Sequence, residues 1–363
     1  MQPTTHCVVP PAVLLLASLA IAQTPQHIVA PSAYTTTDAI SQNWVAGASR
    51  PVRQQTLVGA SHLTAMVGHA LTALELRRTA KPEQYEGGTM HWTVTLSIAP
   101  ITPLQCSSAY AANVGPAPVQ VFDGDVTLPT SPAEPGPVVA WDADNVLRVE
   151  FQQPFPYNGG TLCIDVLGTP IAGQNADWWM ADAMFEDLPG TVVDLGGGCG
   201  AYGGPSHVWS SVQERTLVAG GFAHFTAWGP RMSFAIAAFG VGNPVGIPMT
   251  MLGFASPPEC NLHLSSIDGM IPVLLLPHSN PSLVSRGGRA DVELKLPGTP
   301  YALGIQMTTQ WLEWSQLATS NALQWSVANA VPTLDMALVE SDPSQNNGNV
   351  TVFLAHVMRF EYL

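Results

Sequence analysis

The sequence predicts an all-β protein made of two antiparallel β-sandwich domains with a jelly-roll-like arrangement. Only 10% of the 363 residues are charged, well below the roughly 25% of an average globular protein, and Gly and Pro number 32 each. From residue 55 onward, short apolar segments alternate with turn residues, and no long stretch has the helical period. Because a chain of this length exceeds the usual single core, we expect two domains.

The first 22 residues predict a signal peptide. An apolar run at 12–21 ends in Ala20-Ile21-Ala22, a small-x-small pattern at which signal peptidase cleaves. A run of this length is about half of what a membrane-spanning helix needs, so we expect no membrane span in the mature chain. We therefore expect a secreted protein, extracellular or at the cell surface, that begins at Gln23 and carries residues 23–49 as an N-terminal extension.

Residues 50–189 are predicted to form the first β-sandwich. The segment 91–98 (HWTVTLSI) alternates polar and apolar residues with a period of two, which is typical of a half-buried strand. The segment 178–188 fits either one or two helical turns or a strand that leads into a turn. Further strands are expected at 71–77, 119–128, 146–151 and 161–166.

A glycine-rich stretch begins a second predicted β-sandwich at 190–330. Residues 331–363 are predicted to form a C-terminal β-hairpin, because two apolar segments flank turn residues at 342–348. The alternation at 350–362 also suits a strand that returns to complete the first sandwich, and the second domain is then an insertion. Strands of the second domain are expected at 215–218, 224–227, 232–238, 261–265, 290–295 and 302–309.

The charge balance argues against two classes of partner. The chain has 12 Lys plus Arg against 26 Asp plus Glu, a formal net charge of −14, and no basic cluster larger than Arg77-Arg78. Nucleic acids and anionic membranes attract basic surfaces, so neither is an expected partner. No cofactor motif is found, and calcium is the one metal that short acidic segments suggest.

Four cysteines remain after removal of the signal peptide: Cys106, Cys163, Cys199 and Cys260. An even number suits disulfide formation in an oxidising compartment, and four cysteines allow three pairings among which the sequence does not choose. If each domain closes its own bridge, Cys106 pairs with Cys163 and Cys199 pairs with Cys260. A zinc site is not expected, because the close C-x-x-C spacing of such sites is absent.

The first half resembles a domain of uncharacterised secreted bacterial proteins of the planctomycete type, whose pattern is roughly LSTT, FAxNxG, VFxG, PFxY and LLLDV. The match covers about residues 50–168, although the first motif departs from the pattern by reading Leu96-Ser97-Ile98-Ala99. The other motifs are filled by Tyr110–Pro116, Val121–Gly124, Pro154–Asn158 and Thr161–Val166. This resemblance implies an extracellular β-module and carries no known reaction.

The second half resembles a companion module of the same proteins, over about residues 197–328. Leu262-His263-Leu264 departs from that module's pattern, which has an aromatic-containing stretch after the second cysteine. The matching motifs are Gly198-Cys199-Gly200, Gly246-Ile247-Pro248, Cys260-Asn261-Leu262, Gln310-Trp311 and Ser320-Asn321-Ala322. The resemblance again implies an extracellular β-module only.

A calcium site is the first candidate chemistry. Asp142, Asp144 and Asn145 place oxygen ligands close together, as calcium loops do, and Asp123-Gly124-Asp125 has the same character. Neither segment continues into the full loop spacing, with Gly at the sixth place and an acid at the twelfth. Solvated turns are the alternative interpretation.

Tryptophans are the second candidate, because flat aromatic rings bind sugar rings. Trp178, Trp179, Trp311 and Trp314 are the candidate ligand-binding residues. The alternative is that they belong to the core, where a sandwich tryptophan commonly lies. In an extended segment Trp178 and Trp179 point to opposite faces, so at most one of them is buried in a given core.

These observations favour a non-catalytic extracellular or cell-surface protein that acts by adhesion or glycan binding, with a glycan or a surface protein as partner. One alternative is an extracellular polysaccharide hydrolase, although neither H-E-x-x-H nor G-x-S-x-G occurs. A hydrolase of glycans needs two facing carboxylates, which a sequence does not reveal. A structural component of an envelope or matrix is the other alternative.

Overall fold

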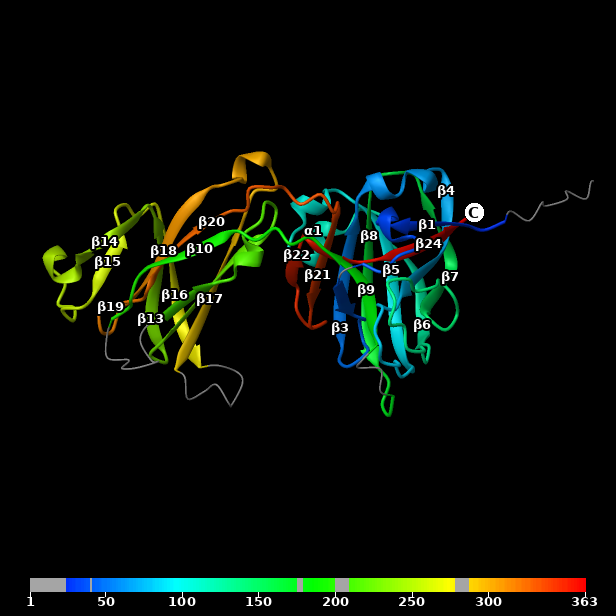
Figure 1. The fold of residues 1–363 in the computed structure, drawn as a ribbon, viewed down its shortest axis with the longest axis horizontal. Helices are drawn as coiled ribbons and strands as arrows, with labels where there is room; N and C mark the ends of the chain where they lie inside the picture. The colour runs from blue at the N-terminus through cyan, green and yellow to red at the C-terminus, as the bar shows by residue number, and fades with distance from the viewer. Residues whose placement is uncertain (1–23, 40, 175–178, 200–208, 278–286) are drawn as a thin grey trace, which may run out of the picture.

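The computed structural model describes residues 24–39, 41–174, 179–199, 209–277 and 287–363. It confirms the all-β prediction: the described strands pair in antiparallel sheets, which gather into two lobes side by side along the long axis (Figure 1). The predicted signal peptide and Trp178 lie outside the described residues. Within the described ranges, no helix combines the length and apolar character needed to cross a bilayer.

The first lobe is built around a six-stranded sheet of order β22-β21-β3-β8-β5-β6. A four-stranded sheet of order β1-β24-β4-β7 and a three-stranded sheet of order β2-β9-β23 share a core with it. The strands are β1 (Gln26–Ala30), β2 (Ser41–Trp44), β3 (Val52–Val58), β4 (His69–Arg77), β5 (Gly88–Ala99), β6 (Val119–Leu128), β7 (Val146–Tyr157), β8 (Thr161–Pro170), β9 (Met180–Phe185), β21 (Met336–Ser341), β22 (Asn349–Thr351), β23 (Leu354–His356) and β24 (Met358–Tyr362).

The main core of the molecule lies between these sheets. Strand β5 shows why the sequence folds this way: Met90, Trp92, Val94 and Leu96 are buried at every second position, and the residues between them lie on the other face. The alternation read from the sequence is therefore the alternation of the strand. The ambiguous segment 178–188 contains strand β9 rather than a helix.

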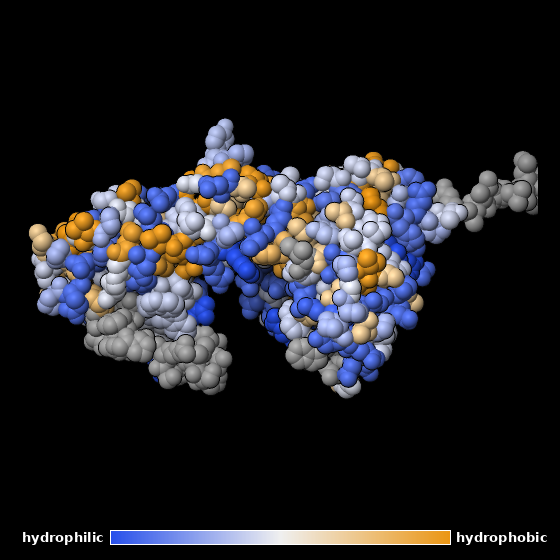
Figure 2. All heavy atoms as spheres, in the orientation of Figure 1, coloured by the Kyte–Doolittle hydropathy of each residue, from blue (hydrophilic) through white to orange (hydrophobic). Residues whose placement is uncertain are grey.

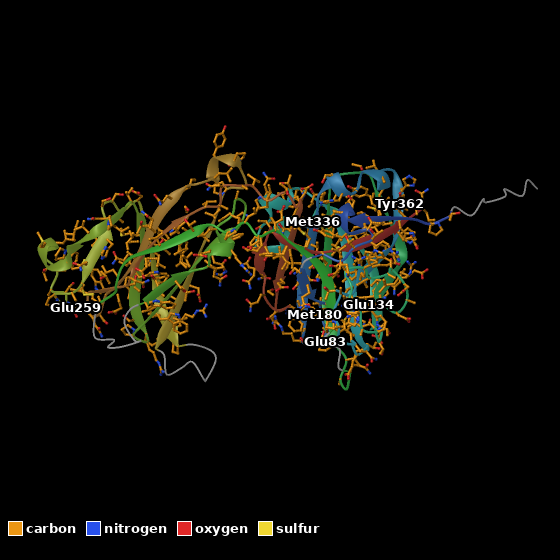
Figure 3. All side chains as sticks on the ribbon, in the orientation of Figure 1. Glu83, Glu134, Met180, Glu259, Met336 and Tyr362 are labelled. Atoms are coloured by element: carbon orange, nitrogen blue, oxygen red, sulfur yellow. A yellow bond between two sulfur atoms is a disulfide. The ribbon has the colours of Figure 1, made fainter. Side chains whose placement is uncertain are left out.

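The end of the chain lies in the first lobe. Strand β24 pairs with β1 on one side and with β4 on the other, and β21 pairs with β3. Figure 1 shows the blue N-terminal and red C-terminal strands together in this lobe, and Figure 3 places Tyr362 of β24 at the opposite end of the molecule from Glu259. The second lobe is thus an insertion between β9 and β21.

The second lobe is one nine-stranded sheet rather than a two-sheet sandwich. Its order is β10-β20-β18-β13-β16-β17-β12-β11, with β19 beside β18. The backbone N–H of Ser210 in β11 donates to Asn321 Oδ1 at 2.7 Å, which brings the two ends of the sheet together. Its strands are β10 (Thr191–Gly196), β11 (Trp209–Val212), β12 (Phe222–Gly229), β13 (Ser233–Gly240), β16 (Gly269–Pro277), β17 (Gly288–Lys295), β18 (Gln306–Glu313), β19 (Ala318–Thr319) and β20 (Ala322–Ser326).

Strand β16 makes the difference between the sandwich expected and the barrel-like sheet observed. It pairs with β13 through residues 269–275 and then with β17 through Leu276 and Pro277, so the two halves of the lobe run into one sheet. A separate hairpin of β14 (Gly242–Pro248) and β15 (Asn261–Leu264) lies at the outer end of the lobe (Figure 1).

Helical segments are short and lie between strands. The strand expected at 215–218 is wrong: a 3-10 turn occupies Glu214–Thr216, and Leu217 and Val218 are buried in the loop after it. The helical segments are η1 (Ser32–Tyr34), η2 (Ala60–His62), η3 (Thr64–Met66), η4 (Pro103–Gln105), α1 (Tyr110–Asn113), η6 (Glu214–Thr216), η7 (Met249–Leu252) and η9 (Pro300–Ala302).

The two lobes meet over a small apolar cluster on the outer face of the six-stranded sheet. Leu57 and Val339 of that sheet belong to the same cluster as Val218 and Ala328 of the second lobe. The ammonium of Lys295 donates to the backbone oxygens of Cys106 and Gly220, at 2.8 and 2.6 Å. Burial lowers the pKa of Lys295 to about 8. A single cation thus bonds the backbones of both lobes.

The four cysteines divide into one bridge and two free thiols. Cys199 and Cys260 form a disulfide. The other pairing is wrong for this structure, because Cys106 and Cys163 are both free and buried. They lie in the same apolar cluster, but the Cys106 thiol faces the backbone oxygen of Ser107 at 3.8 Å, and burial raises the pKa of both thiols to about 12.

Candidate functional site

The tryptophans proposed from the sequence do not form one site. Trp179 is buried in the first lobe, where its Nε1 donates to Ser131 Oγ at 3.2 Å, and Trp311 is buried in the core of the second lobe. Trp314 is 53% exposed and lies just beyond β18, on the second lobe. Of the described candidates, only Trp314 is accessible to a ligand.

The acidic segment before β7 is a turn. Asp142 and Asp144 are exposed, whereas Asn145 is buried and its side-chain amide donates to Glu134 Oε1 at 3.3 Å. Within the part of the chain that the structure describes, no group of three His, Cys, Asp or Glu residues is arranged to hold a metal ion. The solvated-turn interpretation fits Asp142 and Asp144 better than a calcium loop does.

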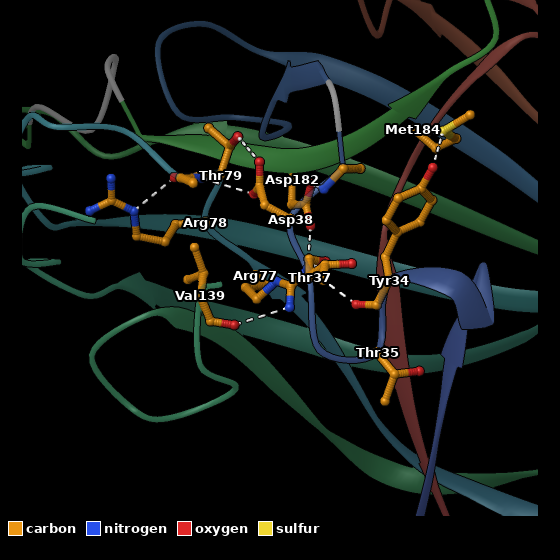
Figure 4. Close-up of polar contacts among 12 residues, drawn as sticks. Tyr34, Thr35, Thr37, Asp38, Arg77, Arg78, Thr79, Val139, Asp182 and Met184 are labelled. Carbon is orange, nitrogen blue, oxygen red and sulfur yellow. Dashed lines mark hydrogen bonds and ion pairs between the residues drawn. The ribbon is translucent and has the colours of Figure 1, made fainter. Parts of the chain in front are cut away.

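A buried ionic network is the most conspicuous cluster of titratable groups in the first lobe (Figure 4). The guanidinium of Arg77 in β4 donates to Asp182 Oδ2 of β9 at 2.5 Å and to the backbone oxygens of Thr37 and Val139 at 2.6 and 3.0 Å. Asp38 accepts from the backbone N–H of Ala80 at 2.9 Å. The side chains of Arg77 and Asp182 have no exposed surface.

The charges of this network perturb one another. Burial, opposed by the bond from Arg77 and reinforced by the charge of Asp38, raises the pKa of Asp182 to about 6. Burial also raises the pKa of Asp38. Since the network fastens residues 34–39 onto β4 and β9 and its central ion pair is sealed from solvent, we interpret it as a structural clamp rather than a catalytic pair of carboxylates.

The outer face of the second lobe carries a different arrangement. In β12 the residues Ala223, Phe225 and Ala227 are buried, so the intervening His224, Thr226 and Trp228 lie on the outer face. The register places Trp209 of β11 opposite Trp228, and Trp228 opposite Arg289 of β17. Trp209 is 49% exposed, and the Arg289 guanidinium lies 5.5 Å from the Trp228 ring centre.

Polar side chains of β12 and β17 continue this face. Thr226 donates to Asp291 Oδ1 at 2.6 Å, and Arg289 donates to the same oxygen at 2.7 Å. One row further, His224 Nε2 lies 2.9 Å from Glu293 Oε1. We name the face formed by Trp209, Trp228, Thr226, Arg289 and Asp291 the tryptophan face; it joins aromatic surface to hydrogen-bonding side chains.

A groove extends this face onto the neighbouring strand. Leu274 and Leu276 of β16, both exposed, line an open hollow of about 670 Å³ together with Arg289 and Asp291. Figure 2 shows hydrophobic residues over the part of the sheet where Figure 1 labels β16 and β18, and again near the tip formed by η7. The second lobe therefore offers an elongated surface of mixed character.

Sequence reasoning missed the tryptophan face, although half of its signal is visible. Trp228 lies at alternate positions with the polar residues His224 and Thr226, so in a strand all three side chains point to the same, outward face. The position of Trp209 opposite Trp228 depends on the cross-strand register, which the sequence does not specify.

No protein-family model, no curated protein and no solved structure matches this chain.

Proposed function

We propose that the protein is a non-catalytic, extracellular or cell-surface protein that binds glycans through the tryptophan face of its second lobe. The observation that carries the proposal is the cross-strand pair of Trp209 and Trp228, with a polar row beside it on the same outer face. Of the other four tryptophans in described strands, Trp92, Trp311 and Trp325 are buried, and Trp44 is exposed at the end of β2. Among the described strands, Trp209 and Trp228 are the two tryptophans that lie directly opposite each other across a strand pair.

The chemistry of the face suits a sugar chain. The C–H face of a sugar ring packs against an indole, and its hydroxyl groups form hydrogen bonds with charged and amide side chains. Asp291 and Arg289 supply an acceptor and donors beside the two indoles. Three strands hold these groups at fixed spacing, so little ordering is needed on binding.

The net charge narrows the ligand to neutral glycans. A chain with a formal net charge of −14 repels polyanionic polysaccharides at low ionic strength. The Cys199–Cys260 disulfide supports an oxidising compartment, where such glycans are found.

A glycan array and a pull-down with insoluble neutral polysaccharides test the proposal. We expect binding by the protein and a loss of at least about tenfold in affinity for Trp209→Ala with Trp228→Ala, because buried aromatic contacts dominate binding energies. Trp314→Ala is the matched control, since it removes an exposed indole elsewhere on the same lobe. Binding that survives the double substitution contradicts the proposed face.

The same glycans serve to separate the alternatives. Release of soluble sugar from a bound glycan would favour the hydrolase, and a protein that neither binds nor cleaves any glycan would favour a purely structural role. Both outcomes overturn the proposal of a non-catalytic glycan-binding protein.

A further inference from the structure

A pocket in the first lobe lies between the segment that follows β2 and the neighbouring strands β3 and β21. Its volume is about 180 Å³, and it is lined by Trp44, Ser49, Arg50, Gln54 and Glu340, with the segment 45–46 and Val52 completing the wall. Glu340 and Gln54 are direct cross-strand partners. The pocket lies in a different lobe from the tryptophan face.

The floor of the pocket holds an unpaired amide. Gln54 is 5% exposed, yet no side-chain hydrogen bond links its amide to another described residue. Its neighbour Gln55, by contrast, donates to Asp165 Oδ2 at 3.0 Å and accepts from Asn113 at 2.8 Å. The amide atoms of Gln54 are not among the fully buried polar atoms that lack a partner, so the amide keeps access to solvent and can meet a ligand in the pocket.

The wall and rim supply complementary chemistry. Trp44 is 47% exposed and borders the opening. Arg50 and Glu340 also line it, and neither forms an ion pair with another described residue. One cation and one anion leave the rim close to neutral, so the pocket demands no net charge of its ligand.

The segment that forms the pocket is held rigidly. The indole Nε1 of Trp92 donates to the backbone oxygen of Ala46 at 2.7 Å. Gly47 has φ +81°, and a Cβ there would lie 2.6 Å from the backbone of Gly168, so only glycine allows this close approach. The pocket is therefore formed before any ligand arrives.

We propose that this pocket is a second glycan site that holds a single sugar ring, such as a chain end or a branch. The ligand class rests on the proposed function. The volume is below the roughly 300–1,000 Å³ of drug-sized sites, which excludes an extended chain. The indole covers one face of the ring, Gln54 bonds a buried hydroxyl, and Arg50 and Glu340 bond neighbouring hydroxyls as donor and acceptor.

Two glycan sites on two lobes would strengthen the binding of a branched or long polysaccharide. A glycan that lies along the tryptophan face and presents a second chain end to this pocket is bound at both places, and the second contact forms at a high effective concentration. Binding of a polysaccharide then exceeds the binding of either isolated fragment.

Saturation-transfer NMR with single sugars tests the pocket directly. The probes are glucose, galactose, mannose, xylose and N-acetylglucosamine, with glycine and glutamine as a zwitterionic arm. We expect at least one sugar to bind with a millimolar dissociation constant, and Trp44→Ala and Gln54→Leu each to weaken it at least about tenfold. Gln54→Leu keeps the shape of the side chain, and thermal unfolding confirms that each variant is folded.

The control variant is Trp209→Ala with Trp228→Ala, which leaves this pocket intact. Sugar binding that persists in that variant but is lost in Trp44→Ala supports the pocket whatever happens to the tryptophan face. Three results overturn it: no sugar binds, only the amino acids bind, or the bound sugar is unaffected by Trp44→Ala and Gln54→Leu. Loss of polysaccharide binding in the control variant reports on the proposed function separately.

Discussion

The two lobes distribute their apolar residues in opposite ways. The main core of the first lobe contains 34 buried residues, whereas that of the second lobe contains 14, five of them alanine. Of the 21 large apolar residues that are exposed in the described ranges, 16 lie in the second lobe. Because burial of apolar surface drives folding and its exposure marks contact surfaces, the first lobe is the stable frame, and the proposed binding surface lies on the second lobe.

The two lobes also differ in the burial of some of their charged residues. The first lobe buries Arg77, Arg78 and Asp182 in networks that join its sheets. The second lobe keeps Arg289, Asp291 and Glu293 on its outer face. These charged side chains thus join sheets inside one lobe and lie on the surface of the other.

The largest expected effect comes from breaking the buried ion pair of the frame. Asp182→Ala leaves Arg77 buried without its partner, and we expect the first lobe to lose about 3–5 kcal/mol of unfolding free energy. Urea denaturation measures this, with Asp187→Ala as control, because Asp187 is exposed and 3.9 Å from Arg215. A loss below about 1 kcal/mol would show that the network adds no more than a surface pair does.

The disulfide provides the corresponding test of the second lobe. Replacement of Cys199 and Cys260 by alanine removes a bridge between residues 61 positions apart, and we expect the second lobe to lose about 2–4 kcal/mol. Calorimetry of the protein with and without reductant measures this. Reductant should leave the transition of the first lobe unchanged, because its cysteines are free thiols; a shift of both transitions contradicts a bridge confined to the second lobe.

Two buried groups of the first lobe, Asp182 and His356, should change its stability in opposite directions as the pH falls. Asp182, with its pKa raised to about 6, binds a proton more readily in the folded state, so its contribution to stability rises as the pH falls from about 6 toward 4. Burial lowers the pKa of His356 to about 4, so the unfolded state takes up that proton first, and its contribution falls over pH 6.5 to 4.

The two variants should therefore diverge from the parent protein in opposite directions. From pH 6.5 to 4, Asp182→Asn should lose stability more steeply than the parent, and His356→Gln less steeply. Denaturation curves at several pH values measure both slopes. Equal slopes in all three proteins would mean that the pKa of neither group differs between the folded and unfolded states.

The smallest expected effect concerns the contact between the lobes. Lys295→Met removes two hydrogen bonds but also a partly desolvated charge, so we expect a change of about 1 kcal/mol or less at pH 7. Because the folded pKa of Lys295 is about 8, its contribution to stability rises between pH 8 and 10.5. Unfolding curves across that range should lose this rise in Lys295→Met and keep it in the control Lys81→Met.

The strands that sequence reasoning located are those with simple alternation. Strand β5 is one of them, because one of its faces is buried and the other is half-exposed. Strand β3 was missed because Gln54 and Gln55 occupy buried positions that apolar residues commonly fill. Strand β16 was missed because Pro272 lies inside it, and the sheet tolerates that proline where β16 has β13 as its only partner.

The sites were harder to predict than the strands, for a physical reason. The pocket joins Trp44 and Gln54 to Glu340, which is far away in sequence, and the tryptophan face joins three strands through their register. Local patterns give the face on which a side chain lies, but not the neighbour that it meets there.

The position of β24 sets the order in which the molecule is completed. Strands β1 and β4 have their shared partner only after the whole second lobe has been synthesised. Until then, both strands expose free edges to chaperones or to aggregation. For the same reason, proteolytic loss of β24 would open the sheet between β1 and β4.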